Sequence, residues 1–327
     1  LRRQRQMCIR DSYTTVEFTS KPIEEIEFDR YIDAYPFVPN NQDERIVRCL
    51  EILHIQAQGL ATRLSKIHCK DVVIGISGGL DSTLALLVCH EAFKINNYDS
   101  KGIHAITMPG FGTTKRTKSN AQILMDLLHV SSEEISIVGG VNQHFKDIHH
   151  NPEVHNITYE NSQARERTQI LMDLSNAYNA IVVGTGDLSE LALGWCTYNG
   201  DHMSMYAVNA SVPKTLVRYI VESVALKDEI LHDVLMDICD TPVSPELLPP
   251  DKNGKIAQKT EEVLGSYDLH DFFLYQMLRH HDEPKKIYDL ACVAFKDVEK
   301  ETIKKAITTF YNRCLLYTSP SPRDGAT

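Results

Sequence analysis

Hydrophobic residues recur in two different patterns along this chain of 327 residues. Between positions 43 and 67, leucines and isoleucines recur at the spacing of one helix face. Further along, short runs rich in Val and Ile alternate with longer segments of helical spacing. The short runs predict strands at 72–77, 103–108, 134–138 and 181–184. The longer segments predict helices at 82–95, 116–129, about 160–179 and 187–193.

Strands that alternate with helices indicate an α/β fold in which a parallel sheet is flanked by helices. After Lys214 the pattern is helical almost throughout, with a Pro-rich break at 241–250. We therefore expect a mostly helical C-terminal part. Sheets of this kind bind ligands beyond the carboxyl ends of their strands, so the segments that follow the predicted strands are the first place to look for chemistry.

The segment after the first predicted strand predicts a phosphate-binding loop. It runs from Gly75 to Ser82 and comprises Gly75, Ile76, Ser77, Gly78, Gly79, Leu80, Asp81 and Ser82. A glycine pair before a helix lets backbone N–H groups approach a polyanion, and the helix dipole adds partial positive charge. A Walker loop would carry Lys immediately before its Ser or Thr, where this chain has Asp81. A carboxylate beside phosphates requires a cation, so Asp81 predicts Mg²⁺. The alternative is that Asp81 only caps a helix beginning at Ser82.

Three later segments extend this prediction. Thr185 follows the fourth predicted strand and would lie beside the first loop if the two strands are neighbours. Glu190 could complete the Mg²⁺ site with Asp81, or could simply interact with a helix dipole. Lys214 at a helix start opposes the dipole, which favours an anionic partner such as ATP phosphates over a solvated lysine. The segment 108–117 suits either an adenosine or phosphate contact or an ordinary surface loop.

Composition excludes several classes of protein. The net charge of −10 disfavours non-specific binding to nucleic acids or to a membrane surface. No apolar segment approaches the roughly 18 residues that cross a bilayer, and no signal peptide is evident. Eight cysteines occur without a C-x-x-C pair, which favours core thiols of a cytoplasmic protein over a zinc site or disulfides.

Both ends of the chain differ from the rest. Residues 7–12 can be encoded by a DNA string whose reverse complement encodes residues 314–318, as expected if a sequencing adaptor had been translated. We therefore expect 1–12 and 314–327 to be artefacts, 13–41 to be a linker from an upstream domain, and 42–313 to be one ATP-dependent domain cut at its C-terminus.

Taken together, the motifs resemble those of NAD⁺ synthetases, which belong to the PP-loop ATP pyrophosphatases with an adenine nucleotide alpha hydrolase-like fold. The similarity is to the synthetase domain of the long glutamine-dependent bacterial form and runs through nearly all of 30–313. The S-G-G-x-D-S pattern marks only the superfamily, whereas E-N-x-Q-A-R together with G-T-G-D-L-S-E is more discriminating. The matching segments are SGGLDST (77–83), MPGFGTT (108–114), ENSQAR (160–165), GTGDLSE (184–190), WCTY (195–198), VPKT (212–215) and TEEVLGSYDLHDFF (260–273).

The resemblance implies ATP-dependent amidation of nicotinic acid adenine dinucleotide (deamido-NAD⁺). The pyridine carboxylate would attack the α-phosphorus to give an adenylate and pyrophosphate, and ammonia would displace AMP. The family's ammonia comes from glutamine through a glutaminase domain, and its members form dimers through the synthetase domain. By resemblance, residues 75–82, Thr185 and Lys214 bind ATP, and Asp81 and Glu190 hold Mg²⁺. Asp81 and Lys214 would serve catalysis. The dinucleotide would contact Asn161, Arg165, Glu190, Trp195, Cys196, Thr197 and Tyr198.

The sequence departs from the family pattern at two points, and several alternative functions stay open. Tyr198 stands where short ammonia-dependent members carry Lys, and a substrate-binding Lys of the family lies beyond Arg313. We therefore expect the chain as given to have low activity. Another PP-loop amidoligase, such as GMP synthetase or asparagine synthetase, would lack E-N-x-Q-A-R. A tRNA-modifying PP-loop enzyme should be basic and often carries C-x-x-C. A third alternative is an ATP-binding module without enzymatic activity.

Overall fold

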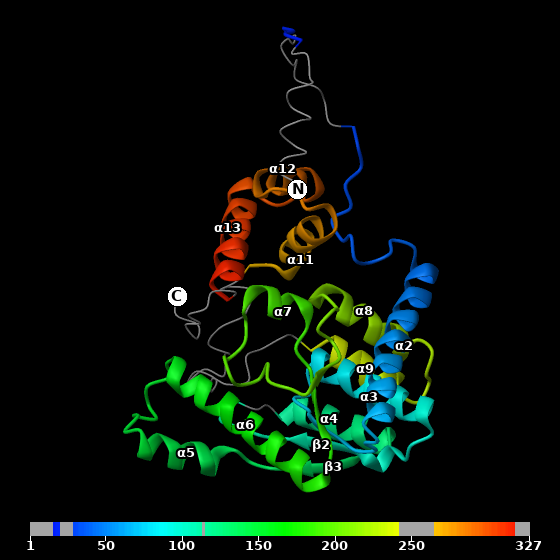
Figure 1. The fold of residues 1–327 in the computed structure, drawn as a ribbon, viewed down its shortest axis with the longest axis vertical. Helices are drawn as coiled ribbons and strands as arrows, with labels where there is room; N and C mark the ends of the chain where they lie inside the picture. The colour runs from blue at the N-terminus through cyan, green and yellow to red at the C-terminus, as the bar shows by residue number, and fades with distance from the viewer. Residues whose placement is uncertain (1–15, 20–28, 113–114, 242–264, 318–327) are drawn as a thin grey trace, which may run out of the picture. The chain divides into compact units, whose positions relative to one another are not determined.

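The computed structural model describes residues 16–19, 29–112, 115–241 and 265–317 (Figure 1). By its internal contacts the chain divides into two units, 1–32 and 33–327. The sheet, the helices around it and the candidate site all belong to the second unit. Thr113, Thr114, the Pro-rich segment and the two outer ends lie wholly or partly outside the described residues.

Five parallel strands form a sheet within the described part of the chain. In spatial order they are β3 (Ser131–Glu134), β2 (Ile103–Thr107), β1 (Val72–Gly75), β4 (Ile181–Gly184) and β5 (Tyr206–Ala207). The chain moves outward from β1 to β3 and then returns to the other side of β1 with β4. The strand order therefore reverses between β1 and β4, and a reversal of this kind opens a crevice at the carboxyl edge. The predicted parallel sheet is confirmed.

The third predicted strand is wrong in its position. The sequence pattern favoured 134–138, whereas β3 spans Ser131–Glu134 and α5 (Val138–Asp147) begins directly at Val138. β3 is an edge strand with largely exposed Ser and Glu side chains, so it leaves no hydrophobic pattern. Ile135 and Ile137 produced the apolar signal, but they follow the strand and pack into the core. The pattern analysis also missed β5, since two residues are too short to show a period.

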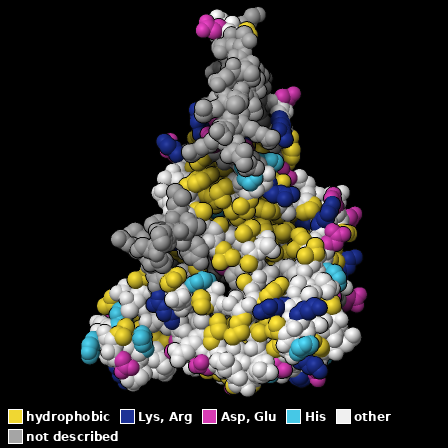
Figure 2. Space-filling model, in the orientation of Figure 1, with side chains coloured by type: hydrophobic (Ala, Val, Ile, Leu, Met, Phe, Trp, Pro, Cys, Tyr) yellow, Lys and Arg dark blue, Asp and Glu magenta, His cyan; other side chains and the backbone are white. Residues whose placement is uncertain are grey.

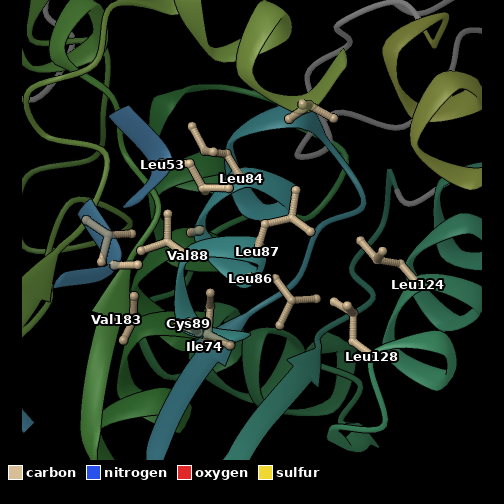
Figure 3. Close-up of a cluster of buried hydrophobic side chains, with 14 of the residues drawn as sticks. Leu53, Ile74, Leu84, Leu86, Leu87, Val88, Cys89, Leu124, Leu128 and Val183 are labelled. Carbon is tan, nitrogen blue, oxygen red and sulfur yellow. The ribbon is translucent and has the colours of Figure 1, made fainter. Parts of the chain in front are cut away.

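On one face of the sheet, α3 (Leu80–Asn96) and α4 (Lys115–Leu127) pack against the strands. Three further helices pack on these two and on one another: α2 (Gln42–Lys66), α8 (Lys214–Ala225) and α9 (His232–Cys239). Val72 and Ile74, two positions apart in β1, are fully buried in the same cluster as side chains from these helices. Figure 3 shows Ile74 and Val183 of the sheet beside Leu84 and Val88 of α3. The predicted helices at 43–67, 82–95 and 116–129 are thus confirmed to within a few residues.

The opposite face packs against α5 and α6 (Ile157–Tyr178). Val73, which alternates with Val72 and Ile74, lies in a separate buried cluster with Ile106 of β2 and Phe145 of α5. Because side chains alternate across a strand, β1 is buried on both faces. This explains why its sequence is an uninterrupted apolar run.

The C-terminal part is helical, as predicted. It contains α11 (Tyr267–Tyr275), a π-helical turn at Gln276–His280, α12 (Pro284–Ala294) and α13 (Lys300–Tyr317), and α11 and α13 both pack against α7 (Leu188–Leu193). Figure 2 shows hydrophobic side chains gathered across the middle of the molecule, where Figure 1 draws α7, α8 and α11. None of the described helices is both long and apolar enough to cross a membrane.

Candidate active site

The turn between β1 and α3 has the geometry of an anion-binding loop. Gly78 has a φ of 86°, a conformation that a residue with a Cβ rarely adopts. The hydroxyl oxygens of Ser77 and Ser82 lie 3.1 Å apart, and the Ser77 hydroxyl also accepts the N–H of Gly79 at 3.2 Å. The two serines therefore hold the turn in shape from within.

Helix α3 begins directly after this turn, at Leu80. Gly79 is its N-cap, and no side chain caps it. The alternative in which Asp81 caps a helix starting at Ser82 is therefore wrong, because Asp81 already lies inside the first turn. A helix N-terminus without a side-chain cap favours a bound anion.

A buried asparagine fixes the second loop beside the first. Asn209 is fully buried, and its Nδ2 donates to the carbonyl oxygens of Asp81 and Thr185 at 2.9 and 3.0 Å. Gln56 of α2 donates to Asn209 Oδ1 at 3.1 Å, which sets the orientation of the amide. The placement of Thr185 next to the first loop is thus confirmed. The sequence analysis missed Asn209, which acts through its burial and carries no motif of its own.

Three carboxylates surround the ammonium group of Lys214. Its Nζ lies 2.7 Å from Asp81 Oδ2, 2.8 Å from Asp187 Oδ2 and 2.8 Å from Glu190 Oε1. Asp187 is fully buried, whereas Asp81 and Glu190 remain partly exposed. Asp187 also caps α7 by accepting the N–H of Glu190 at 2.8 Å. The structure therefore brings together Asp81 and Glu190, which the sequence analysis expected to share one cation, and places Lys214 between them.

The anionic partners of Lys214 include carboxylates, where the sequence analysis expected ATP phosphates. Its position at the start of α8 opposes the helix dipole, and the three carboxylates compensate for that. Asp187 was missed in this role. Its sequence signal is the D-x-x-E capping-box pattern of 187–190, which the structure forms in full.

Burial and charge act against each other on these groups. Burial alone would lower the pKa of Lys214, but Asp81, Glu190 and Asp187 together raise that pKa well above its ordinary value. Burial raises the pKa of Asp187, the charge of Glu190 adds to that rise, and Lys214 opposes it. Burial likewise raises the pKa of Glu190 against the opposing effect of Lys214. Lys214 therefore stays charged, and it stabilises acidic groups that would otherwise repel each other.

The same carboxylates fit a divalent cation. Asp81, Asp187 and Glu190 each offer an oxygen, and these three atoms lie within 4.8 Å of one another. Mg²⁺ prefers such hard oxygen ligands and usually takes only one or two carboxylates beside phosphate oxygens and water. The donor set therefore agrees with the predicted Mg²⁺ ligands Asp81 and Glu190.

A cavity of about 190 Å³ lies beside the loops at the carboxyl edge of the sheet. It is lined in part by Gly75, Ile76, Ser77, Met108, Leu171 and Thr185. Arg167 of α6 and Asp201 also line it, and neither was among the predicted site residues. The cavity thus joins the first loop to the segment after β2, whose predicted alternatives included an adenosine contact.

The predicted dinucleotide-binding residues gather between α6 and the segment after α7. The hydroxyl of Thr197 donates to Asn161 Oδ1 at 2.7 Å, and both residues are buried. Arg165 donates through Nε and Nη2 to the carbonyl oxygen of Tyr198 at 3.2 and 3.1 Å. Asn161 and Arg165 therefore fix the segment 195–198, and the Tyr198 side chain is 41% exposed.

Trp195 and Cys196 connect this segment to the helices. The N–H of Trp195 donates to the carbonyl oxygen of Glu190, and Arg313 of α13 lies over the Trp195 ring at 5.0 Å from its centroid. Cys196 is partly buried. The segment 195–198 is thus fixed at Trp195 to the backbone of Glu190 and at Thr197 and Tyr198 to α6.

Comparisons with known proteins agree with this geometry. The NAD synthase family model matches residues 52–312. The chain is 41% identical over 304 residues to the glutamine-dependent NAD(+) synthetase of Mycobacterium leprae, covering 90% of this chain and 45% of that protein. It is 31% identical over 234 residues to the NH(3)-dependent NAD(+) synthetase of Staphylothermus marinus, covering 70% of this chain and 76% of that protein.

A solved structure shows the same fold. The glutamine-dependent NAD+ synthetase of Acinetobacter baumannii, in complex with ADP, aligns with a TM-score of 0.55 and 24% identity over 84% of this chain and 47% of that one. The chain spans about half the length of the glutamine-dependent relatives that it matches. With its motifs, sheet and family-model match all in agreement, this chain belongs to the NAD synthase family.

Proposed function

We propose that this chain is the ATP-dependent part of a glutamine-dependent NAD⁺ synthetase, which amidates deamido-NAD⁺ through an adenylate and releases AMP and pyrophosphate. One observation carries this proposal: Lys214, Asp81 and Glu190 meet directly beside the Ser77–Ser82 turn. Adenylating a carboxylate requires that the negative charge of a triphosphate be neutralised where the diphosphate leaves. A lysine and a cation-binding pair of carboxylates at a helix N-terminus meet that requirement.

Each group has a defined task in this proposal. The N–H groups at the start of α3 and the hydroxyls of Ser77 and Ser82 bind the departing diphosphate. Lys214 supplies a positive charge to the same phosphates. A Mg²⁺ ion held by Asp81 and Glu190 would neutralise further phosphate charge. Thr185, fixed by Asn209, would contact the nucleotide from the neighbouring strand.

The nucleoside would occupy the cavity between the first loop and α6, where Met108 and Leu171 provide apolar walls. The A. baumannii synthetase was solved in complex with ADP, which supports nucleotide binding by a chain of this fold. The acceptor would lie against Asn161, Arg165 and 195–198, because this segment is held to Glu190 by the Trp195 N–H. The two substrates would then meet at the carboxylate cluster.

The remaining parts of the reaction come from outside the described residues. We propose that a glutaminase domain supplies ammonia, since the relatives named glutamine-dependent are about twice as long as the matched region. A homodimer in the cytoplasm is the expected assembly. The described cysteines are free, in agreement with a reducing compartment.

The decisive experiment measures AMP formation from ATP with ammonium chloride and deamido-NAD⁺. It should use the full chain in parallel with a version continued beyond Arg313 by the C-terminal segment of the M. leprae relative. We expect AMP formation that requires deamido-NAD⁺ and ammonia, with more activity in the continued version.

Matched acceptors and variants separate the alternatives. Xanthosine monophosphate and aspartate should not support AMP formation, whereas activity with either would favour another PP-loop amidoligase. Asp81→Asn should abolish pyrophosphate release. If the continued version binds ATP but releases no AMP with any acceptor, the chain is a binding module and the proposed function is wrong.

A further inference from the structure

Helix α8, which carries Lys214 at its first position, has no cap of its own. Its N-cap is Pro213, whose side chain has no acceptor for the N–H groups of the first turn. The first N–H groups of a helix need partners. The N–H of Leu216 finds the carbonyl oxygen of Pro213 at 2.9 Å. Those of Lys214 and Thr215 are satisfied by two side chains from elsewhere in the chain.

Ser189 and Asp271 supply these two partners. The N–H of Lys214 donates to Ser189 Oγ at 2.9 Å, and the N–H of Thr215 donates to Asp271 Oδ2 at 2.9 Å. Ser189 belongs to α7, and Asp271 belongs to α11. The start of α8 is therefore capped by residues that reach it from two other helices.

The Asp271 carboxylate joins both of these contacts. It is 2% exposed, and its Oδ1 accepts the Ser189 hydroxyl, while its Oδ2 accepts both the N–H and the hydroxyl of Thr215. Burial raises the pKa of Asp271, and the bonds from Ser189 and Thr215 lower it. Three donors thus converge on one buried carboxylate.

The residues bound by Asp271 are sequence neighbours of the charged cluster. Ser189 precedes Glu190, and Thr215 follows Lys214. On the same face of α11, one turn earlier, the Tyr267 ring lies 5.6 Å from the Lys214 ammonium. Helix α11 therefore reaches Lys214 in two ways. Asp271 binds the backbone N–H of the next residue, Thr215, and the Tyr267 ring lies against the Lys214 ammonium.

We propose that Asp271 is a positioning residue for the synthetase reaction, which locks the starts of α7 and α8 together so that Glu190 and Lys214 meet at the phosphate end of the site. Asp271 does not touch the reacting atoms and acts only through Ser189 and Thr215. The inference rests on the proposed function, because it assigns Lys214 and Glu190 to the phosphates.

The first test compares kcat for ammonia-dependent AMP formation in variants of the version continued beyond Arg313. In Asp271→Asn an NH₂ group replaces one oxygen and faces donors, so the lock is broken. We expect kcat to fall about 10- to 100-fold, as when groups that orient a metal or phosphate site are removed. Ser189→Ala should lower kcat, and combining it with Asp271→Asn should add little, since both changes break one chain of bonds.

A conservative pair covers the case in which Asp271→Asn does not fold. Thr215→Ser keeps the hydroxyl and should retain the parental kcat, whereas Thr215→Val keeps the shape and should lower it. Ser223→Ala is the matched control, because Ser223 is a buried serine nine positions after Lys214 in α8, and its hydroxyl bonds the carbonyl oxygen of Tyr219 and the Cys49 thiol instead of residues of the charged cluster. Equal kcat values for Thr215→Ser and Thr215→Val would overturn the proposal.

A second readout does not depend on activity. Amine acylation of the full chain, followed by mass spectrometry of the peptide with Lys214, measures how firmly its ammonium is held. We expect Lys214 to react faster in Asp271→Asn or Thr215→Val than in the parent, with exposed Lys286 as internal reference. Unchanged Lys214 labelling in folded variants would overturn the positioning role. If the parent forms no AMP but Lys214 is still acylated faster in these variants than in the parent, the proposed function fails and the positioning role stands.

Discussion

At the scale of single residues, Lys214 determines whether the acidic cluster is tolerable in the folded chain. Its ammonium is within 2.8 Å of three carboxylates, one of which is fully buried. Removing one partner of a buried ion pair leaves the other charge uncompensated, which is costly. The cluster and a divalent cation also use the same oxygens, so Lys214 competes with a metal for Asp81 and Glu190.

Lys214→Met should therefore destabilise the chain and increase its response to Mg²⁺. We expect the free energy of unfolding to fall by about 3 kcal/mol without metal, because Asp187 loses its buried counter-charge. Added Mg²⁺ should restore part of that loss in the variant and have less effect on the parent. Urea unfolding with and without Mg²⁺ measures both.

Lys304→Met is the control, since Lys304 pairs with Glu301 and both side chains are exposed. Its loss should change the free energy of unfolding by less than about 1 kcal/mol and should not depend on Mg²⁺. If Mg²⁺ does not change the free energy of unfolding of Lys214→Met, the proposed cation site is wrong.

Asp201 gives a second residue-scale prediction, on pH. Burial raises its pKa, although the Thr197 N–H and nearby positive charges oppose the rise. A carboxyl with a raised folded-state pKa contributes stability below its unfolded pKa of about 3.9 and loses that contribution as pH rises through the folded value. The parent should therefore lose stability relative to Asp201→Asn as the pH rises above about 4.

Denaturant midpoints of the parent and of Asp201→Asn, measured as the pH is raised, test the direction of this stability change. The difference in midpoint between Asp201→Asn and Asp201→Ala should stay constant with pH, because neither variant has the titrating carboxyl. A parent that gains stability relative to Asp201→Asn as pH rises would show that hydrogen bonds and positive charge outweigh burial.

Sequence motifs marked the residues that the structure brings together in the charged cluster. Asp81, Glu190 and Lys214 were each predicted from a loop or a helix start, and the structure places them together. Asp187 and Asn209 were missed for a physical reason. Their importance comes from burial and from partners far away in sequence, such as the 128 positions between Asn209 and Asp81. Neither property is visible in local spacing.

At the scale of elements, the turn between β1 and α3 depends on its glycine conformation. Gly78→Ala should cost about 1–2 kcal/mol, because its φ of 86° lies where L-residues are strained. Gly139→Ala in α5 is the matched change, since a Cβ there meets no atom within 4 Å. It should stabilise the chain by up to about 1 kcal/mol.

Thermal or urea unfolding distinguishes the two glycine variants. Only Gly78→Ala should also weaken nucleotide binding, measured by calorimetry with ADP. If both variants lose stability equally, the strain argument at Gly78 is wrong.

Element prediction was most accurate where burial imposes a pattern. β1 and β4 are apolar throughout, and the sequence predicted their bounds to within two residues. It predicted the start of α6 to within three residues. β3 at the sheet edge is polar, and the first residue of α5 is followed by two glycines that disfavour helix prediction. In both cases tertiary packing overrides the local sequence signal.

At the scale of the whole molecule, the chain divides into two units at Ile32. A version that begins at Asp33 should therefore unfold in one cooperative transition, with the same midpoint as the full chain. Calorimetry measures the midpoint and the cooperativity. A lower midpoint would show that the first 32 residues stabilise the second unit.

The capping of α8 by α11 also bears on when the protein becomes functional during its synthesis. Lys214 and Asp81 are 133 positions apart, and Ser189 and Asp271 are 82 apart. Contacts this distant form only after long loops have closed. A nascent chain on the ribosome therefore cannot complete the cap of α8, beside the Lys214 cluster, before α11 has emerged.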